Sequence, residues 1–344
     1  MSQKIRIAKW DNLKLFLIFT VVLGHICDRC IESGGDEFKG LFAFLYLFHV
    51  PAFFFISGLF AKRAVASKDY GKVWSFIKLY FFVNVLIFLI SYICKTAKHI
   101  SFVSVQGLPW FMLSLAVMFL ITIIFRNVDP KWVMITSIVL CLISGFIKPT
   151  KTLDADFLAY MRTLSFYPYF YLGYAIDRDK LCKAANKKWV RVISAVCLTA
   201  VCTICFILPK YVYMLRPLLT CRNYYSVLKE YAPYGLILKL LLLAVGFIMI
   251  FMLISVTPNK RFKASKLGER TLEIYTFSNC FVIPIFSVLQ FDEFMSVNFP
   301  KWFLLSTIIL ALIITLICSM KVFTYPVKWI MNNQNKLRKQ KNIV

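Results

Sequence analysis

The chain has 344 residues, of which 60% are hydrophobic and 17% are aromatic, whereas water-soluble domains contain roughly 45–50% apolar residues. This composition excludes an ordinary soluble protein and indicates an integral membrane protein. The net charge of +25 does not indicate binding to nucleic acid, because the Lys and Arg residues lie in short loops between apolar runs and no nucleic-acid motif accompanies them.

Ten apolar segments are predicted to be membrane-spanning helices, since about 20 residues at ~1.5 Å each cross ~30 Å of hydrocarbon. In chain order the predicted spans lie near 11–28, 40–60, 74–94, 109–126, 131–148, 158–177, 190–208, 233–256, 272–290 and 301–322. No polar stretch between them is long enough for a separate soluble domain. Residues 1–344 are therefore predicted to form a single all-α, polytopic domain in the lipid bilayer.

The distribution of positive charge predicts the orientation in the membrane. An even number of spans places both termini on one side, and the loops on that side hold more than twice as many Lys and Arg residues as the opposite loops. Positively charged loops stay in the cytoplasm. We therefore predict a multi-pass protein of the cell (inner or plasma) membrane with both termini cytoplasmic and the segment 209–232 outside.

The first span, WDNLKLFLIFTVVLGHICDRC (residues 10–30), carries Asp11, Lys14 and His25. Lys14 and His25 are separated by about three helical turns plus 20°, so both side chains leave the same face, ~16 Å apart along the axis. Asp11 lies one turn before Lys14, close enough to pair with it. Because a charge inside a span costs roughly 2.5–3.5 kcal/mol, such residues usually face protein or a water-filled cavity. Lys14 alone could also extend to the membrane surface.

The second span contains FLYLFHVPAFFFISGLF (residues 44–60), with His49, Pro51 and Ser57. Pro51 leaves a backbone carbonyl without its helical partner and can bend the helix, which opens space beside His49. The short connection 29–39 predicts that the first two spans pack antiparallel. Ser57 is then expected near the level of Lys14, with His49 deeper in the membrane and two of the three histidines in one groove.

Cysteine spacing gives little indication of a metal centre. Most of the eleven cysteines lie inside apolar runs, where cysteine behaves as a small hydrophobic residue. Two C-x-x-C pairs occur, Cys27/Cys30 and Cys202/Cys205, and a zinc site would need two further ligands for either pair. No metal site and no permanently bound cofactor are predicted.

These motifs resemble acyltransferase family 3, a family of integral-membrane acyltransferases. The resemblance begins with a basic residue, ten others and a histidine in the first span, followed by F-H-x-P-x-F-F-F-x-S-G in the second. The form DNLKLFLIFTVVLGH is similar to the fucose 4-O-acetylase-like branch. Three later segments, LPWFMLSL (108–115), FYPYFYLGY (166–174) and LGERTLEIYTF (267–277), are similar to family segments in the same order.

The resemblance implies an O-acyltransferase that moves an acyl group, with acetyl as the first expectation, from acyl-CoA to a hydroxyl of a cell-surface sugar, glycolipid or polysaccharide precursor. A hydroxyl is a weak nucleophile, so His25 is expected to act as general base, since imidazole can take up and return a proton near neutral pH. His49 is expected to orient His25 or to contact the tetrahedral intermediate. Acetyl-CoA, or another acyl-CoA, is expected as co-substrate, with its phosphates on the cytoplasmic side. Residues expected to bind the donor or substrate are Arg6, Asp11, Lys14, Ser57, Arg63 and Trp110.

The sequence departs from the family pattern in three places. The late motif often ends in histidine, where this chain has Ser278, and the basic residues Lys72 and Lys78 at the third span lack the usual following proline. The C-terminal esterase-like domain of some members is not expected here. One alternative is a secondary transporter of sugars or peptides, which would show paired repeats or Gly/Pro-broken helices in matching halves. Another is a flippase or polymerase for lipid-linked glycans, which would bind polyprenyl-phosphate sugars and ignore acyl-CoA. A purely structural membrane subunit would leave the ionisable face of the first span unexplained.

Overall fold

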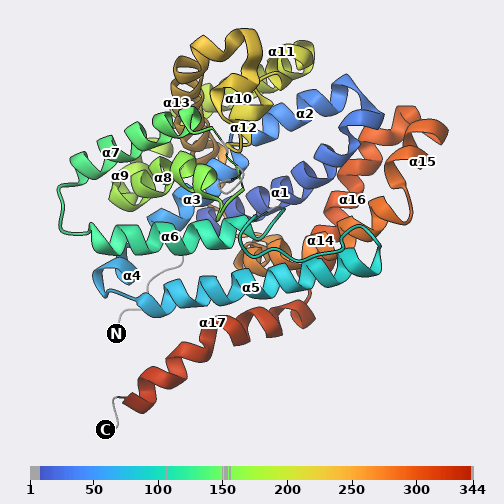
Figure 1. Ribbon diagram of the computed structural model, residues 1–344. Coiled ribbons are helices and arrows are strands. Elements are labelled where there is room, and N and C mark those ends of the chain that lie inside the picture. Colours follow the sequence, from blue (N-terminus) through green and yellow to red (C-terminus); the bar gives the residue numbers. More distant parts are fainter. Residues whose placement is uncertain (1–7, 106, 149, 151–153, 155, 342–344) are drawn as a thin grey trace.

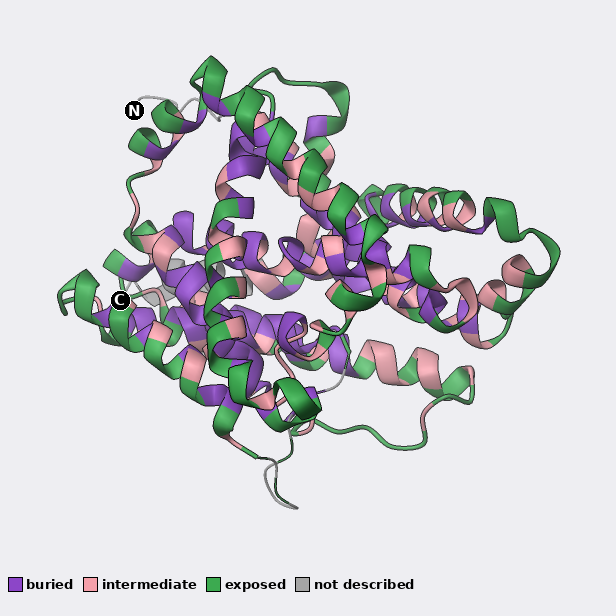
Figure 2. Ribbon diagram, turned by 90° about the horizontal axis from the view of Figure 1, so that it is seen from above, coloured by how far each residue is buried: buried purple, intermediate pink, exposed green. Residues whose placement is uncertain are grey.

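The computed structural model of the protein describes residues 8–105, 107–148, 150, 154 and 156–341. Over these residues the fold is all-helical, which confirms the predicted class, and an isolated β-bridge joins Ser104 to Phe157. The helices pack side by side as one bundle (Figure 1). Buried residues gather along the middle of the bundle, and exposed residues cover its outward faces (Figure 2).

Five helical segments are long and apolar enough to cross a membrane: Asp36–Leu59, Tyr70–Ile93, Lys188–Ile207, Tyr225–Val256 and Pro300–Cys318. A sixth results if Thr271–Ser287 and Phe291–Asn298, which are bent by 56°, form one span. The segment Lys188–Ile207 is only 17% buried inside the protein. A helix that is apolar and mostly exposed on the protein surface requires apolar surroundings, such as the hydrocarbon of a bilayer.

Each predicted span contains helix, although several helices end earlier than predicted. The first half of the chain forms α1 (Ala8–Gly34), α2 (Asp36–Tyr46), α3 (His49–Leu59), α4 (Lys62–Ala66), α5 (Tyr70–Ile93), α6 (Trp110–Ile124), α7 (Pro130–Ile143), η1 (Ser144–Phe146) and α8 (Tyr160–Ala175). The second half forms α9 (Arg178–Ala185), α10 (Lys188–Ile207), α11 (Pro209–Tyr213), α12 (Arg216–Leu219), η2 (Tyr225–Tyr234), α13 (Gly235–Val256), η3 (Lys263–Glu269), α14 (Thr271–Ser287), α15 (Phe291–Asn298), η4 (Pro300–Trp302), α16 (Phe303–Cys318) and α17 (Lys321–Lys341).

Three of the predicted spans correspond to short helices. Helices α6, α7 and α8 have 15, 14 and 16 residues, and 15 residues of α-helix extend only ~22 Å, which is less than ~30 Å of hydrocarbon. The number of ten crossings therefore stays a prediction.

The connection between the first two spans is tighter than the predicted loop 29–39. Helix α1 continues to Gly34, and α2 begins at Asp36 after Gly35, whose φ of 70° is accessible to glycine without strain. The ring of Phe38 packs over Gly34, where a Cβ would lie only 2.1 Å from the ring. The chain therefore turns sharply between the two helices.

The predicted second span, 40–60, is a pair of helices, α2 and α3, separated at Leu47 and Phe48. Pro51 accounts for the break, because it has no N–H to donate to the carbonyl of Leu47 one turn earlier. It lies in the first turn of α3, where a missing N–H is tolerated. The break places His49 at the first position of a helix.

Helices α3 and α8 approach each other at two glycines. A Cβ on Gly58 would lie 1.9 Å from the carbonyl oxygen of Phe170, and a Cβ on Gly173 would lie 2.0 Å from that of Phe55. Each glycine thus faces the backbone of the partner helix. This close crossing fixes α3, which carries His49 and Ser57, against α8, which carries Arg162.

Polar contacts join the loops at one end of the bundle. The Nζ of Lys9 donates to Asn186 Oδ1 (2.7 Å), Asn12 donates to the carbonyls of Pro258 and Lys260 (both 2.9 Å), and Lys62 Nζ donates to the carbonyl of Ile176 (2.8 Å). These contacts bring together the start of α1 and the loops near 61–73, 178–191 and 260–270, all of which the charge pattern assigns to one side.

The segments at the other end of the bundle contact one another in the same way. Arg216 Nη2 donates to Asp28 (2.8 Å), and Ser33 Oγ donates to Asp292 (3.1 Å). Arg222 Nε donates to Asp156 Oδ1 (3.0 Å). The end of α1 and the loops near 156, 209–232 and 290–300 therefore meet at one end, opposite to the start of α1.

Candidate active site

A cavity of about 790 Å³ lies inside the bundle. Side chains from ten helical elements line it: α1, α2, α3, α5, α6, α8, α12, η2, α14 and α17. Its volume falls within the roughly 300–1,000 Å³ of small-molecule sites. On α1 the lining residues are Lys14, Ile18, Val21, His25 and Asp28. Their spacing of three and four residues marks one helical face, so Lys14 and His25 do share a face and this face borders the cavity.

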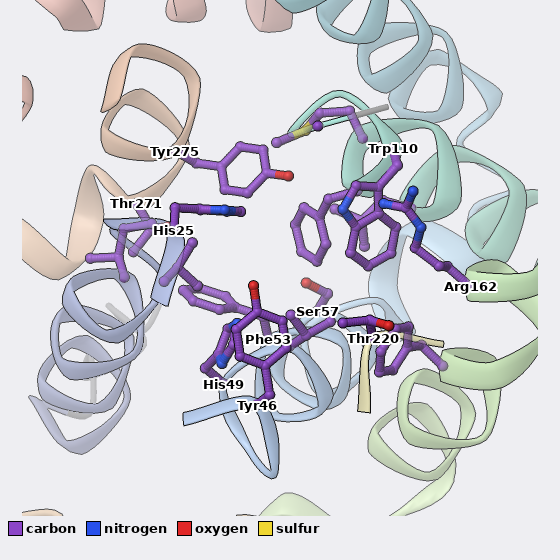
Figure 3. A pocket seen from close by; sticks show the side chains of 18 of the residues that line it. His25, Tyr46, His49, Phe53, Ser57, Trp110, Arg162, Thr220, Thr271 and Tyr275 are labelled. Atoms are coloured by element: carbon purple, nitrogen blue, oxygen red, sulfur yellow. The ribbon is translucent and has the colours of Figure 1, made fainter. Parts of the chain in front are cut away.

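Five of the residues predicted for the site line this cavity together: Lys14, His25, His49, Ser57 and Trp110. Figure 3 shows the ring of His25 and the hydroxyl groups of Tyr46, Ser57 and Tyr275 directed toward the middle of the pocket. Trp110 and Arg162 close the opposite wall in this view. The side chains come from six helices, so the site exists only in the folded bundle.

The break between α2 and α3 determines the orientation of His49. The carbonyl of Leu45 accepts a hydrogen bond from Phe48 N–H (3.1 Å) and lies 2.6 Å from His49 Nδ1. A carbonyl oxygen can only accept, so Nδ1 carries the proton and, in the neutral ring, Nε2 holds the lone pair. The ring of Tyr46 packs edge-on against His49, with 4.6 Å between the ring centroids.

His49 also lies close to the backbone beside His25. A Cβ on Gly24 would lie 3.6 Å from Cε1 and 3.8 Å from Nε2 of His49, which is ordinary van der Waals contact. The Nε2 side of the His49 ring therefore faces α1 at the residue that precedes His25. The two imidazoles lie on neighbouring helices and border the same space.

Two lysines line the cavity toward the start of α1. The Nζ of Lys14 lies 4.6 Å from the centroid of the Phe60 ring, and the Nζ of Lys72 lies 4.5 Å from the centroid of the Phe119 ring. Aromatic faces attract cations at such distances. The contacts hold two ammonium groups at one end of the cavity, and such groups attract the phosphates of an anionic ligand.

Arginines line the cavity toward the other end of α1. Arg162 Nη2 donates to Asp156 Oδ1 (2.5 Å) and to the carbonyl of Val105 (3.2 Å), and its guanidinium carbon lies 4.7 Å from the centroid of the Trp110 ring. Arg222 binds the same carboxylate of Asp156 through Nε and Nη2. Arg216 pairs with Asp28 at 2.8 Å.

Two residues predicted for the donor site, Asp11 and Arg63, do not line the cavity. Asp11 is buried at the start of α1, where its backbone packs against Gly268 of η3. Arg63 is exposed on α4. Arg6 lies outside the described residues. Asp11 and Arg63 both lie toward the same end of the bundle as Lys14 and Lys72.

Sequence reasoning missed several residues of the cavity, among them Tyr46, Lys72, Arg162, Arg222 and Tyr275. Tyr46 could have been predicted because it lies three residues, about one helical turn, before His49. Arg162 could have been predicted because it is a charged residue within a predicted span. Arg222 lies in a polar loop and carried no such signal.

The late motif contributes a tyrosine to the cavity. Tyr275 lines it, and its hydroxyl donates to the carbonyl of Leu108. Ser278, which stands where the family often has histidine, is buried outside the lining and donates to the carbonyl of Tyr275 (3.3 Å). Among the residues that the structure describes, no group of three His, Cys, Asp or Glu side chains could hold a metal ion.

Comparison with known proteins identifies the family. The acyltransferase domain of family 3 matches residues 7–323. The chain is similar to the nodulation protein NolL of Sinorhizobium fredii, with 25% identity over 183 residues that cover 48% of this chain and 47% of the relative. It is also similar to the nodulation protein NolL of Mesorhizobium japonicum, with 33% identity over 69 residues that cover 20% of this chain and 18% of the relative. No solved structure matches the chain.

The family match includes every helix that lines the cavity apart from α17, which contributes Met331 to the lining and lies almost entirely beyond residue 323. The chain therefore belongs to acyltransferase family 3. The matches span about half the length of the first curated relative and less than a fifth of the second.

Proposed function

We propose that this acyltransferase moves an acyl group, with acetyl as the first choice, from acyl-CoA to a hydroxyl of a cell-surface sugar, glycolipid or polysaccharide precursor. One observation carries the proposal. A single cavity is lined by two lysines, two imidazoles and three arginines. Along α1 the lining residues Lys14, His25 and Asp28 follow in that order, and Arg216 pairs with Asp28. Such an arrangement lets an anionic donor approach from one end and an acceptor from the other.

The proposed orientation has ten crossings of the cell (inner or plasma) membrane, with both termini in the cytoplasm. The short helices α6, α7 and α8 are then accommodated by a locally thinner bilayer or by flanking side chains that extend to the membrane surface. In support, every loop contact at the Lys14 end joins segments assigned to the cytoplasm by their charge, and every loop contact at the Asp28 end joins segments assigned to the outside.

The donor is proposed to bind at the Lys14 end. CoA carries phosphate groups, and Lys14 and Lys72 line this end of the cavity. The charge pattern of the sequence places Arg6 and Arg63 on the same side of the membrane as Lys14. Their positive charge would attract the anionic donor before it binds. Beyond the lysines the wall is apolar and aromatic, with Phe53, Phe76 and Trp110 in the lining. This wall suits the pantetheine arm and the thioester.

The chemical step is proposed to use His25 as general base. His25 removes the proton of the acceptor hydroxyl while the oxygen forms a bond to the thioester carbon. The tetrahedral intermediate then collapses, the carbon–sulfur bond breaks, and the CoA thiolate takes the proton back from the His25 imidazolium. Imidazole suits both transfers because it changes protonation near neutral pH.

His49 is proposed to support this step through Nε2. Its Nδ1–H is bound to the carbonyl of Leu45, which fixes the ring and leaves Nε2 beside α1. Nε2 can then accept a hydrogen bond from the acceptor hydroxyl or from His25. The hydroxyl of Tyr46, directed into the pocket (Figure 3), is a candidate donor to the oxyanion of the intermediate. Ser57 lines the same region and is assigned to substrate contact.

The proposal is tested by mass spectrometry of cell-surface glycans from cells that express the full chain, the His25→Ala variant or no protein. An acetyl increment that depends on the intact chain supports acetyl transfer, and a larger increment identifies another acyl donor. Identical glycan spectra in all three samples, with the protein present in the membrane, would contradict the proposal. Purified protein with labelled acetyl-CoA and the modified glycan's precursor provides the direct measurement.

A further inference from the structure

The arginines at the Asp28 end of the cavity are separate from the lysines proposed to bind the donor. Lys14 and Asp28 are fourteen residues apart on α1, which corresponds to ~21 Å along the helix. Phosphates bound at Lys14 therefore lie far from the guanidinium groups of Arg162 and Arg222. This second cationic group needs an explanation of its own.

The pair of arginines carries more positive charge than its carboxylate neutralises. Arg162 and Arg222 share the single carboxylate of Asp156. The side chains of Arg162 and Asp156 are 5% and 8% exposed, whereas that of Arg222 is 43% exposed. One net positive charge thus remains on a cluster that is buried at Arg162 and reaches the surface at Arg222. Asp154, whose carboxylate accepts from the backbone N–H of Asp156, is exposed. An anionic ligand that pairs with the cluster offsets the cost of keeping its buried part out of water.

Arg162 also has hydrogen-bonding capacity that the described protein does not use. Its Nε is buried without a hydrogen-bond partner among the described residues, and its hydrogen bonds to Asp156 and Val105 both come from Nη2. The residue is 4% exposed and lines the cavity. Figure 3 shows its guanidinium beside Trp110 at the wall of the pocket. A guanidinium N–H without a partner can donate to a carboxylate or phosphate oxygen.

From these features we infer that the acyl acceptor carries an anionic group, a phosphate or a carboxylate on the sugar, that binds to Arg162 and Arg222. The inference rests on the proposed acyl transfer and adds the substrate class. Arg216 also lines this end of the cavity, but its charge is paired with Asp28, so we assign it to the cavity wall and not to binding of the anionic group. The anionic group holds the sugar at the outer end, which leaves a hydroxyl free to reach His25.

The test measures binding of three probes to the purified full chain in phosphatidylcholine nanodiscs, in a buffer without phosphate. Glucose 1-phosphate and glucuronate carry the two anionic groups, and glucose is the neutral control. We expect the wild type to bind one or both anionic probes about ten- to a hundredfold more tightly than glucose, the range for a charge-assisted contact. The tighter anionic probe identifies phosphate or carboxylate as the recognised group.

Two variants and one matched control identify the residues. Arg222→Gln should remove most of the preference, and Arg261→Gln should keep it, because Arg261 is an exposed arginine that pairs with Glu269 at 3.5 Å outside the cavity. Asp156→Asn keeps both guanidinium groups and removes the competing carboxylate, so it should bind the anionic probes at least as tightly as the wild type. This variant preserves the test if Arg222→Gln does not fold.

Equal affinity of the wild type for all three probes overturns the inference. The inference is also overturned if the Arg222→Gln variant still prefers the anionic probes over glucose while a folded Asp156→Asn variant does not. Acetyl-CoA binding and glycan acetylation are measured on the same preparations. If acetylation occurs without any anion preference, only the substrate class is wrong. If acetyl-CoA does not bind and no glycan is acetylated, the proposed function itself fails.

Discussion

Gly58 of α3 and Gly173 of α8 each face the backbone of the other's helix, so that a Cβ on either would lie about 2 Å from a carbonyl oxygen. We expect Gly58→Ala and Gly173→Ala to destabilise the protein by about 1–3 kcal/mol or more, because packed backbones cannot move aside as a side chain can. The apparent melting temperature of the purified protein in detergent should fall for both variants.

A matched variant separates this clash from the general effect of replacing a glycine. Gly24→Ala on α1 would place its Cβ at ordinary contact distance, 3.5 Å from Tyr46 and 3.6 Å from His49. Alanine favours helix over glycine by about 1 kcal/mol, so the melting temperature of Gly24→Ala should stay equal or rise. An equal fall in all three variants would contradict the close-crossing explanation.

The orientation in the membrane makes a prediction about thiol labelling. In a variant without reactive native thiols, Ser226→Cys should react with a membrane-impermeant maleimide on intact cells, because residue 226 is exposed in the segment 209–232. Ser67→Cys is the matched control, since Ser67 is exposed after α4 at the opposite end of the bundle. It should react only after permeabilisation. The reverse pattern would show that the termini are outside.

The residues that were predictable from sequence share one helix or one short motif. Lys14 and His25 lie on the same face because the helical period determines their angular separation, whatever the rest of the fold does. His49 and Ser57 belong to a single motif on the next helices in the chain. The antiparallel packing of these elements through a short connection was enough to bring the four residues to one cavity.

The residues that escaped prediction depend on contacts between distant loops. Asp156, Arg162 and Arg222 meet only because the loop before α8 packs against residues 103–105 and against the loop after α12. No periodicity relates such segments. The break at Leu47 and Phe48 was also missed, because a proline inside an apolar run indicates a bend without determining whether the helix continues.

Lys14 provides a prediction about the donor. Lys14→Ala should raise the KM for acetyl-CoA by about tenfold, the effect of losing one charge-assisted contact. Lys14→Arg should restore much of the affinity, since a cation remains at that depth. The measurement is initial rates of acetyl transfer over a range of acetyl-CoA concentrations. Full turnover of Lys14→Ala at limiting acetyl-CoA would remove Lys14 from the donor site.

The hydrogen bond from His49 Nδ1 to Leu45 makes a separate prediction. His49→Asn keeps a side-chain N–H that can donate to the same carbonyl but has no group at the position of Nε2. We expect a folded protein whose acetyl transfer is reduced at least about tenfold, because general acid–base and hydrogen-bonding roles act through Nε2. Normal turnover in this variant would show that His49 serves only to hold the break between α2 and α3.

The strongest prediction concerns His25, which lines the cavity between the lysines and the arginines. His25→Ala should lower turnover by ~10²–10⁴-fold, the usual contribution of a general base. The variant should still insert into the membrane and bind acetyl-CoA, because Lys14, proposed to hold the donor, lies ~16 Å away along α1.

The His25→Gln variant distinguishes a catalytic base at this position from a residue that only forms structural hydrogen bonds. Glutamine can donate and accept hydrogen bonds, yet it cannot take up the proton of the acceptor hydroxyl. If His25 is the base, His25→Gln should be nearly as inactive as His25→Ala, with unchanged affinity for acetyl-CoA. If His25→Gln turns over at a near-normal rate with purified protein, acetyl-CoA and the acceptor, the proton must go elsewhere. Nε2 of His49, whose ring is already fixed by Leu45, would then be the next group to test.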